Sequence, residues 1–134
     1  MTDEEAARLI GLPHARFPSW TQGLLITDSR LTDNPIIYVN SGFSKLTGYG
    51  QEEILGRNCR FLQGEKSDPA TVTRIRLAVA ARKPFHGTIL NYRKDGTAFV
   101  NQLTIGPLRT EEDGRYFVGL QLDVTPAKDR VRTA

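Results

Sequence analysis

The sequence predicts one α+β domain: a five-stranded antiparallel sheet with short helices packed on one face. Three observations lead to this class. Two strand-like segments begin the core of the chain and three end it, and the helical segments lie between these two groups. Strands and helices therefore do not alternate, which disfavours a parallel sheet. The length of 134 residues and the 39% hydrophobic content suit a single core, and the sequence contains no internal repeat.

The strands are identified by apolar segments bounded by turn residues. Residues 24–27 form the first strand and residues 35–39 the second, and the polar stretch between them predicts a hairpin. Two turns that each contain Asp followed by Gly separate the three later strands, which cover residues 85–93, 97–108 and 115–124.

The helical part of the chain consists of short pieces followed by one longer helix. Residues 41–48 and 51–56 form two pieces that end at glycine, and the segment around the cysteine supplies a third. Asp68 followed by Pro69 is typical of a helix start, with a capping carboxylate and a first-turn proline. One face of the helix that follows combines apolar residues with an arginine: Val72, Ile75, Arg76 and Val79. This pattern predicts that the arginine lies beside core residues.

The chain divides into three predicted parts. Residues 1–22 form an N-terminal cap with a small helix and an apolar arm, residues 23–125 form the core domain, and residues 126–134 form a C-terminal stub. Thr125 and Pro126 resemble a helix cap and a first-turn proline, so the stub is predicted to begin a further helix.

Charge and composition argue against several function classes. The net charge of +3 comes from 18 basic and 15 acidic residues spread along the sequence, so a nucleic-acid-binding face is not expected. The acidic start and the lack of a long apolar run indicate neither a leader nor a membrane span, and a cytoplasmic protein is predicted. One cysteine allows no internal disulfide, and His14 and His86 stand too far apart in the sequence for a zinc site, so no metal is expected.

Motifs of common enzyme classes are also missing. No glycine-rich phosphate-binding motif occurs in the sequence. His86 is predicted on the outer face of the sheet, which disfavours a Cys-His hydrolase. The acidic residues cluster in turns and helix starts, where solvation and capping account for them. The sequence therefore does not predict an enzyme.

Alternation along the last three strands places one side-chain amide in each apolar stripe: Asn91, Asn101 and Gln121. Asn91 and Asn101 share a face only if the turn at Asp95 and Gly96 is a three-residue loop with a bulge, which we predict in preference to a two-residue loop. Each amide would cost about 1 to 3 kcal/mol if buried without a partner, so the three together predict a polar ligand. For any one amide alone, a bond to the backbone is the alternative.

The outer face of the same sheet is too apolar to stand bare in water. It carries Leu90, Tyr92, Val118, Leu120 and Leu122. We expect the N-terminal arm or a second subunit to cover it, and the latter predicts a homodimer through the outer face or the arm.

The cysteine segment, residues 56–66, points to ligand chemistry more than to packing. It holds Cys59 between Arg57 and Arg60, which are predicted to lower the pKa of the thiol and make it reactive. Side-chain amides in the same segment suit the polar edge of a heterocycle, and arginine suits a phosphate. The alternatives are a buried, unreactive cysteine and two arginines on a solvated face.

The run Asn58-Cys59-Arg60-Phe61-Leu62-Gln63 resembles the signature of LOV domains, the flavin-binding blue-light sensors of the PAS superfamily. Further segments that share the resemblance are residues 25–28, 33–38, 90–96, 99–101 and 119–123. The resemblance is specific, because the cysteine, the amides and the arginines all fall in register. It implies the PAS fold, with the sheet and helices arranged around a flavin pocket.

The resemblance also implies a function. Cys59 would be the photoactive thiol that adds reversibly to flavin carbon C4a in blue light, and Gln121 would sense protonation of flavin N5 and relay it to the sheet, the termini or a dimer interface. Arg60 and Arg76 would bind the phosphate of FMN, the expected cofactor, with riboflavin or FAD as alternatives. The implied cofactor-binding residues are Thr27, Asn34, Asn58, Cys59, Arg60, Leu62, Gln63, Val72, Arg76, Val79, Ile89, Asn91, Asn101, Leu103, Ile105, Phe117, Gly119 and Gln121, with Leu25 also in the pocket wall.

Two rival functions stay open. The first is a flavin-binding PAS sensor of redox state or of another ligand, in which Cys59 takes no part. The second is a small flavin-dependent oxidoreductase, although the sequence supplies no nicotinamide motif. The sequence also leaves open whether the chain is a short stand-alone LOV protein or part of a larger receptor.

Overall fold

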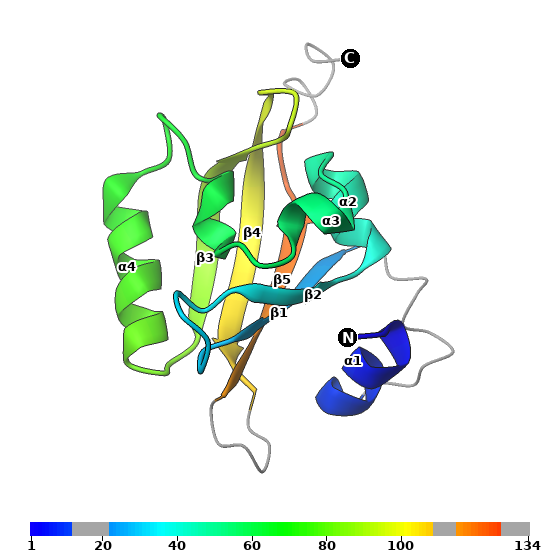
Figure 1. Cartoon of the computed structure of the whole chain (residues 1–134). Coiled ribbons are helices and arrows are strands. Elements are labelled where there is room, and N and C mark those ends of the chain that lie inside the picture. Colours follow the sequence, from blue (N-terminus) through cyan, green and yellow to red (C-terminus); the bar gives the residue numbers. More distant parts are fainter. Residues whose placement is uncertain (12–21, 109–114, 127–134) are drawn as a thin grey trace.

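A computed structural model describes residues 1–11, 22–108 and 115–126. Five antiparallel strands form one sheet in the spatial order β2-β1-β5-β4-β3 (Figure 1). In chain order the elements are α1 (Asp3–Ile10), β1 (Gly23–Asp28), β2 (Ile36–Val39), α2 (Ser41–Thr47), α3 (Gln51–Ile54), the 3₁₀ helix η2 (Cys59–Leu62), α4 (Pro69–Ala80), β3 (Phe85–Tyr92), β4 (Ala98–Pro107) and β5 (Tyr116–Asp123). The predicted α+β class and the five-stranded sheet are confirmed.

The β3–β4 hairpin fixes which side chains face the interior. Its loop has three residues: the backbone N–H of Arg93 donates to the carbonyl of Thr97 at 2.8 Å, and Gly96 adopts a left-handed φ of 88°. Asn91 and Asn101 therefore lie on the same face, where the Asn101 amide donates to Asn91 Oδ1 at 2.9 Å. The predicted loop length and the predicted phase of the two strands are confirmed.

The short helices are placed by side-chain caps. Asn40 precedes α2, and its Oδ1 accepts from the backbone N–H of Phe43 and of Leu24, both at 2.9 Å. This one side chain therefore links the start of α2 to β1. Asp68 caps α4 as predicted, with Oδ1 accepting from the N–H of Ala70 at 3.4 Å.

Helix α4 packs the predicted apolar residues against the sheet: Ile75 is buried, and Val72 and Val79 lie in the same cluster. Thr71 and Ile75 are its buried residues, while Arg76 is exposed. The predicted apolar stripe of this helix is confirmed, whereas a place for the Arg76 side chain within the core is not. Arg76 lies beside that stripe and extends its charge into solvent.

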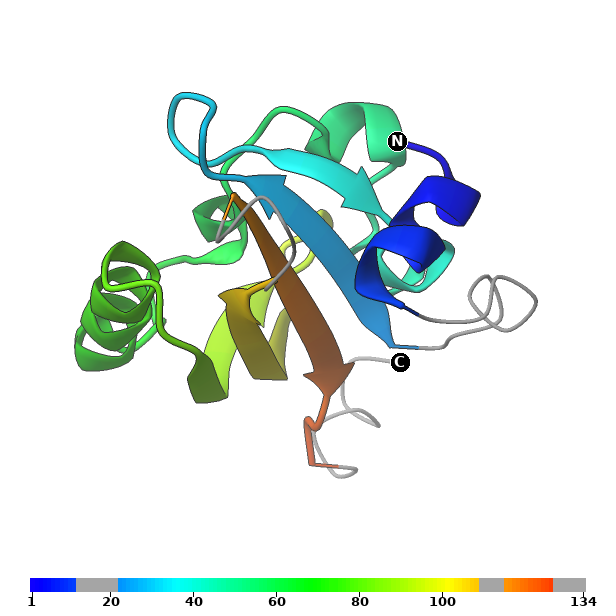
Figure 2. The same ribbon diagram turned by 90° about the horizontal axis from the view of Figure 1, so that it is seen from below.

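Helix α1 covers part of the outer face of the sheet. Ala6 and Ala7 are fully buried against Leu24, Ile26 and Tyr38. Figures 1 and 2 place α1 beside β1 and β2, and α4 at the other side of the molecule beside β3. Helix α1 thus covers this region of the face, whereas the arm expected to do so lies outside the described residues.

The remainder of the outer face is less well covered. Val118 and Leu120 pack against the cluster under α1, whereas Leu122 is 41% exposed. The predicted apolar arm at residues 12–21 and the predicted helix beyond residue 126 lie outside the described residues. In the described ranges, none of the helices has the length and apolar character that a bilayer span requires.

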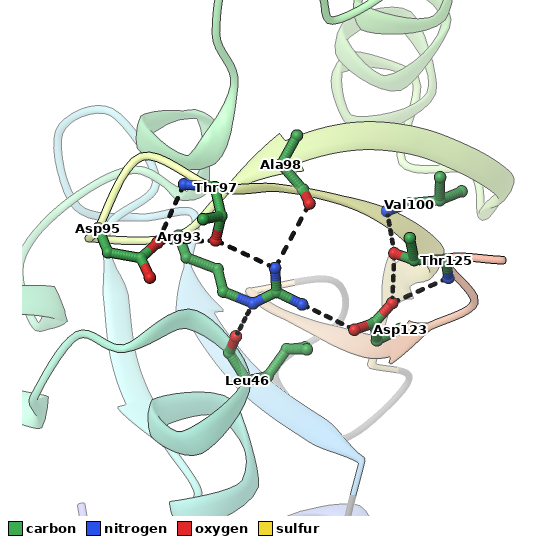
Figure 3. Close-up of polar contacts among 8 residues, drawn as sticks. All are labelled: Leu46, Arg93, Asp95, Thr97, Ala98, Val100, Asp123 and Thr125. Carbon is green, nitrogen blue, oxygen red and sulfur yellow. Dashed lines mark hydrogen bonds and ion pairs between the residues drawn. The ribbon is translucent and has the colours of Figure 1, made fainter. Parts of the chain in front are cut away.

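Arg93 joins three elements at one end of the sheet (Figure 3). Its guanidinium donates to the Leu46 carbonyl at the end of α2 at 3.2 Å and to Asp123 Oδ2 at the end of β5 at 2.8 Å. It also lies over the ring of Phe99 in β4, 4.8 Å from the centroid. Asp123 in turn accepts from the backbone N–H and the hydroxyl of Thr125. These contacts hold the residues that follow β5 against the sheet.

We expect Asp123→Ala to lower the free energy of unfolding by about 2 kcal/mol, because it removes several hydrogen bonds to a charged group that is only partly exposed. The more exposed ion pair between Lys94 and Glu53 serves as the comparison, and Lys94→Ala should lower the free energy of unfolding by less than Asp123→Ala does. Chemical denaturation measures both values. Equal losses for the two variants would contradict the structural role assigned to Asp123.

Candidate functional site

A cavity lies between the inner face of the sheet and the helices η2 and α4. It has about 400 Å³ of space not filled by atoms, part of it open to solvent. The enclosed part of this space is only about 30 Å³, so a ring-sized ligand requires the lining side chains to move apart. Its lining comes from six elements or their ends: Leu25, Cys59, Leu62, Gln63, Ile75, Ile89, Asn91, Asn101, Leu103, Ile105 and Gln121. The wall is thus mainly apolar, with one thiol and four side-chain amides.

The amides of the sheet are buried but incompletely bonded. Asn101 is 1% and Gln121 2% exposed, and neither Asn101 Oδ1 nor Gln121 Nε2 has a hydrogen-bond partner among the described residues. Asn91 bonds to Asn101 and donates weakly to the Leu90 carbonyl at 3.3 Å. Native proteins rarely leave such groups unpaired. The cavity therefore offers an unpaired acceptor and an unpaired donor to a polar ligand.

Two further predicted residues carry buried polar atoms without partners in the described part of the chain. They are Thr27, through Oγ1, and Asn34, through Oδ1. Thr27 lies two positions after Leu25 on β1, which places both side chains on the inner face. The pairing of β1 with β2 is irregular between Ile26 and Thr27. Neither Thr27 nor Asn34 lines the cavity.

Cys59 lies at the start of η2, where it contacts both apolar clusters on the inner side of the sheet. Burial raises the pKa of its thiol, and the positive charge of Arg60 opposes this effect more weakly. The predicted net lowering of this pKa is wrong for two physical reasons, although Arg60 acts in the predicted direction. Desolvation of the thiolate outweighs the charge, and the nearby Asp33 carboxylate counteracts Arg60.

Arg57 makes its contact with an aromatic ring. Its guanidinium lies over the ring of Phe61, 5.3 Å from the centroid, and Phe61 in turn packs edge-on against Tyr49 at 5.1 Å. Arg57 is exposed and contacts an aromatic ring, so the alternative of an arginine on a solvated face describes it better.

The remaining predicted residues lie around the cavity and not in its lining. Val72, Val79 and Phe117 pack in the apolar cluster under α4. Gly119 sits behind Gln121: a Cβ atom there would lie 3.1 Å from Leu25 Cδ1 and 3.4 Å from Gln121 Nε2. A side chain at this position would therefore crowd the cavity wall.

The polar residues Asn58, Arg60 and Arg76 also lie outside the lining. Asn58 caps η2 through Oδ1, which accepts from the N–H of Arg60 at 3.0 Å, and its amide donates to the Asp33 carbonyl at 2.7 Å. Arg60 forms a two-point ion pair with the Asp33 carboxylate. Arg76 is exposed and makes no hydrogen bond or ion pair within the described ranges.

Sequence reasoning missed two residues. Ile75 lines the cavity, and its place on the apolar stripe of α4 was the available signal. Asp33 contacts both Asn58 and Arg60 but was counted among the solvated turn carboxylates. The signal for Asp33 was its position directly before Asn34 in a segment that shares the resemblance.

Comparison with known proteins identifies the family. The profile of the PAS domain matches residues 21–126. A blue-light photoreceptor from Listeria monocytogenes is 50% identical over 107 residues, which cover 80% of this chain and 42% of that protein. A blue-light-activated histidine kinase from Brucella ovis is 53% identical over 104 residues, covering 76% of this chain and 21% of the kinase. The chain thus spans less than half the length of these curated relatives.

Solved structures give the same assignment. The LOV domain of a blue-light-activated histidine kinase from Erythrobacter litoralis has a TM-score of 0.74 at 47% identity, covering 78% of this chain and 96% of that domain. The light-state structure of the Aureochrome1 LOV domain has a TM-score of 0.75 at 43% identity, covering 81% and 86%. The chain therefore belongs to the PAS-domain family and, within it, to the LOV domains.

The raised pKa of Cys59 leads to a test in the dark. Alkylation by iodoacetamide requires the thiolate, so its rate should follow a titration whose midpoint lies above the value of about 8.5 for a free cysteine. Because Cys59 is the chain's only cysteine, mass spectrometry of the whole protein reports this site alone. Restricted access lowers the rate at every pH but leaves the midpoint unchanged. A midpoint below that of free cysteine would overturn the assignment of a neutral thiol.

Proposed function

We propose that this domain is a blue-light sensor that binds FMN noncovalently in the dark and forms a reversible bond between Cys59 and flavin carbon C4a in the light. One observation carries the proposal: the chain's only cysteine lines the same cavity as the buried, partly unpaired amides Asn101 and Gln121. The names of the relatives, which are blue-light photoreceptors and blue-light-activated kinases, agree with this function.

The donor set of the cavity fits a flavin. The edge of the isoalloxazine ring carries both acceptors and donors, which match the unpaired acceptor Asn101 Oδ1 and the unpaired donor Gln121 Nε2. Apolar residues such as Leu62, Ile89 and Leu103 would contact the flat faces of the ring. Asn91 and Gln63 would complete the bonds to the ring edge and the ribityl chain. Arg60 and Arg76 would hold the phosphate of FMN.

The neutral thiol of Cys59 suits a reaction that begins only with light. An excited flavin supplies an electrophilic C4a carbon and a basic N5 nitrogen. With a flavin bound, the Cys59 thiol would supply both the sulfur for the bond to C4a and the proton for N5, so atoms and electrons would balance without an outside reactant. Because burial keeps the thiol protonated, the proton is present before illumination, and Cys59 is a poor nucleophile in the dark.

Gln121 would convert this proton transfer into a structural change. Its side-chain amide offers a donor or an acceptor, depending on its rotation. Next to unprotonated N5 the N–H group is favoured, and next to protonated N5 the carbonyl oxygen is favoured. Gln121 lies on β5 in register with Leu103 of β4 and Gly23 of β1, so its rotation would act on the central strands of the sheet. The sheet would then pass the change to the termini or to a dimer partner.

Four further proposals concern the domain's role, its location, its dimer surface and its boundaries. We propose that this domain is a sensor and not itself an enzyme, that it acts in the cytoplasm, and that any dimer forms through the outer face of the sheet or the N-terminal arm. The partly exposed Leu122 on that face supports the last point. We also propose the core boundaries at residues 23 and 125, and the described strands, from Gly23 to Asp123, lie within them.

The principal rival is a PAS domain that binds a flavin or another ligand while Cys59 takes no part. An absorption spectrum of the purified protein before and after blue light separates the two functions. Bleaching followed by recovery in the dark supports the photoreceptor, and a stable flavin spectrum supports the rival.

Replacement of Cys59 tests the thiol directly. We expect Cys59→Ala and Cys59→Ser to retain flavin absorption and fluorescence but to lose bleaching completely, because the amides and arginines bind the cofactor while the sulfur forms the bond. Arg57→Ala is the matched control from the same segment, since Arg57 contacts Phe61 outside the cavity, and it should bleach normally. Bleaching that persists in Cys59→Ala would refute the role of the thiol.

Replacement of Gln121 tests the relay. Gln121→Leu keeps a similar side-chain volume but removes the amide that would contact N5. We expect a slightly shifted flavin spectrum, normal bleaching, and loss of the light-induced change in solution scattering or dimerisation. A light response equal to that of the wild type would show that the signal leaves the flavin by another residue.

A further inference from the structure

The segment that joins the two helices of the cavity wall is fastened to the edge of the sheet. Residues 64–67, which we call the strap, connect the end of η2 to the start of α4 (Figure 1). The hydroxyl of Ser67 donates to the Leu90 carbonyl, and the N–H of Lys66 donates to the Tyr92 hydroxyl at 3.0 Å. Both acceptors belong to β3, which is an edge strand. In the described ranges the strap forms no backbone–backbone hydrogen bond with β3, so these two side chains fasten it to the strand.

The strap also lies in close contact with the ring of Tyr92. A Cβ atom on Gly64 would lie 2.3 Å from Cε1 and 2.4 Å from Cδ1 of that ring, so only glycine fits without a shift of the strap or the ring. Within the strap, the Gly64 N–H donates to Ser67 Oγ and the Ser67 N–H donates to the Gly64 carbonyl, both at 3.0 Å. The strap is thus a closed turn that packs onto the edge strand as one unit.

The strap borders the cavity at two of its amides. Gln63 directly precedes the strap, and Asn91 lies between Leu90 and Tyr92, the two attachment points on β3. Both amides line the cavity, whereas the residues that fasten the strap do not. The fastening contacts therefore hold the cavity wall in place without touching the space inside it.

A flavin can enter only if part of the cavity wall moves, because the enclosed space is only about 30 Å³. The sheet is the less movable side, since β3 pairs with β4 in continuous register from Phe85 to Tyr92. The helical side has fewer bonds: η2 contains four residues, and the strap that follows is held to the sheet by side chains. Segments with few contacts open at lower free energy than paired strands. Release of the strap would let η2 and α4 move apart and would carry Gln63 away from the cavity.

We propose that the strap is a gate for the cofactor, held shut by Tyr92 and Ser67, and that its opening limits the rate at which a flavin enters and leaves the cavity. The fastening bonds involve no residue of the cavity lining, so they stabilise the empty and the filled site equally. Weakening them therefore speeds entry and release by the same factor and leaves the affinity unchanged. This inference rests on the proposed function, since its ligand is the noncovalently bound flavin.

The rates are measured in the dark on the full chain loaded with FMN. Bound FMN is displaced by a large excess of riboflavin, and the FMN set free is separated by ultrafiltration and quantified over time. Equilibrium dialysis gives the Kd for FMN. The release rate divided by the Kd gives the association rate, so the two directions of the gate are compared in each variant.

Three variants weaken the gate in different ways. Tyr92→Phe removes the hydroxyl and keeps the ring, so it should raise the release rate about fivefold, the effect of one lost hydrogen bond, and change the Kd less than about twofold. Ser67→Ala removes the bond to the Leu90 carbonyl and should act in the same direction. Gly64→Ala forces the strap away from the Tyr92 ring and should raise the release rate at least about tenfold at a similar Kd.

Tyr38→Phe is the matched control. It also removes a tyrosine hydroxyl with a hydrogen bond, but that bond joins Asp3 of α1 on the outer face of the sheet. The release rate of this variant should equal that of the wild type.

The outcomes separate this inference from the proposed function. Release at the wild-type rate in both Tyr92→Phe and Ser67→Ala overturns the gate. A weaker Kd with an unchanged association rate also overturns it, because these residues would then stabilise only the filled site. In both cases FMN binding stands, and the proposed function with it. A wild-type chain that binds no FMN overturns the proposed function and the gate together.

Discussion

The stability of the sheet depends on three buried side-chain amides that lie among apolar residues. Asn91, Asn101 and Gln121 lie on adjacent strands and face a cavity lined mainly by aliphatic side chains. Within the described chain these amides bond to each other or to the backbone for only part of their capacity. Unpaired buried groups cost about 1 to 3 kcal/mol each, so the sheet is stabilised by any ligand that completes their hydrogen bonds. Affinity for a polar ring and stability of the sheet are therefore linked.

The same wall controls the chemistry of Cys59. Its surroundings raise the pKa of the thiol, and the nearest cation, Arg60, is held by Asp33. A sensor gains from this arrangement, because a thiolate would react in the dark with oxidants and electrophiles. A neutral thiol remains inert until its partner becomes reactive. The apolar environment that appears to weaken the nucleophile thus gives the proposed switch its low dark activity.

The sequence was sufficient to predict the sheet, but not the pKa of Cys59 or the ion-pair partner of Arg60. Alternation along the strands and the Asp95-Gly96 turn predicted that Asn91 and Asn101 share the inner face, since both follow from local geometry. The pKa of Cys59 depends on desolvation by residues distant in sequence, so neighbouring arginines misled the prediction. The partner of Arg60 lies 27 residues away in a turn whose left-handed residues no pattern of polarity reveals.

The position of Gln121 on β5 explains how a change in the cavity would reach the end of the domain. Gln121 and Asp123 lie two residues apart and so share the inner face of the strand. Asp123 bonds to Arg93 and to Thr125, which in turn accepts from the N–H of Val100 on β4 (Figure 3). A shift of β5 at Gln121 therefore strains the contacts of the residues that leave the sheet. Since Arg93 also bonds to the end of α2, the same strain acts on the helical side of the cavity.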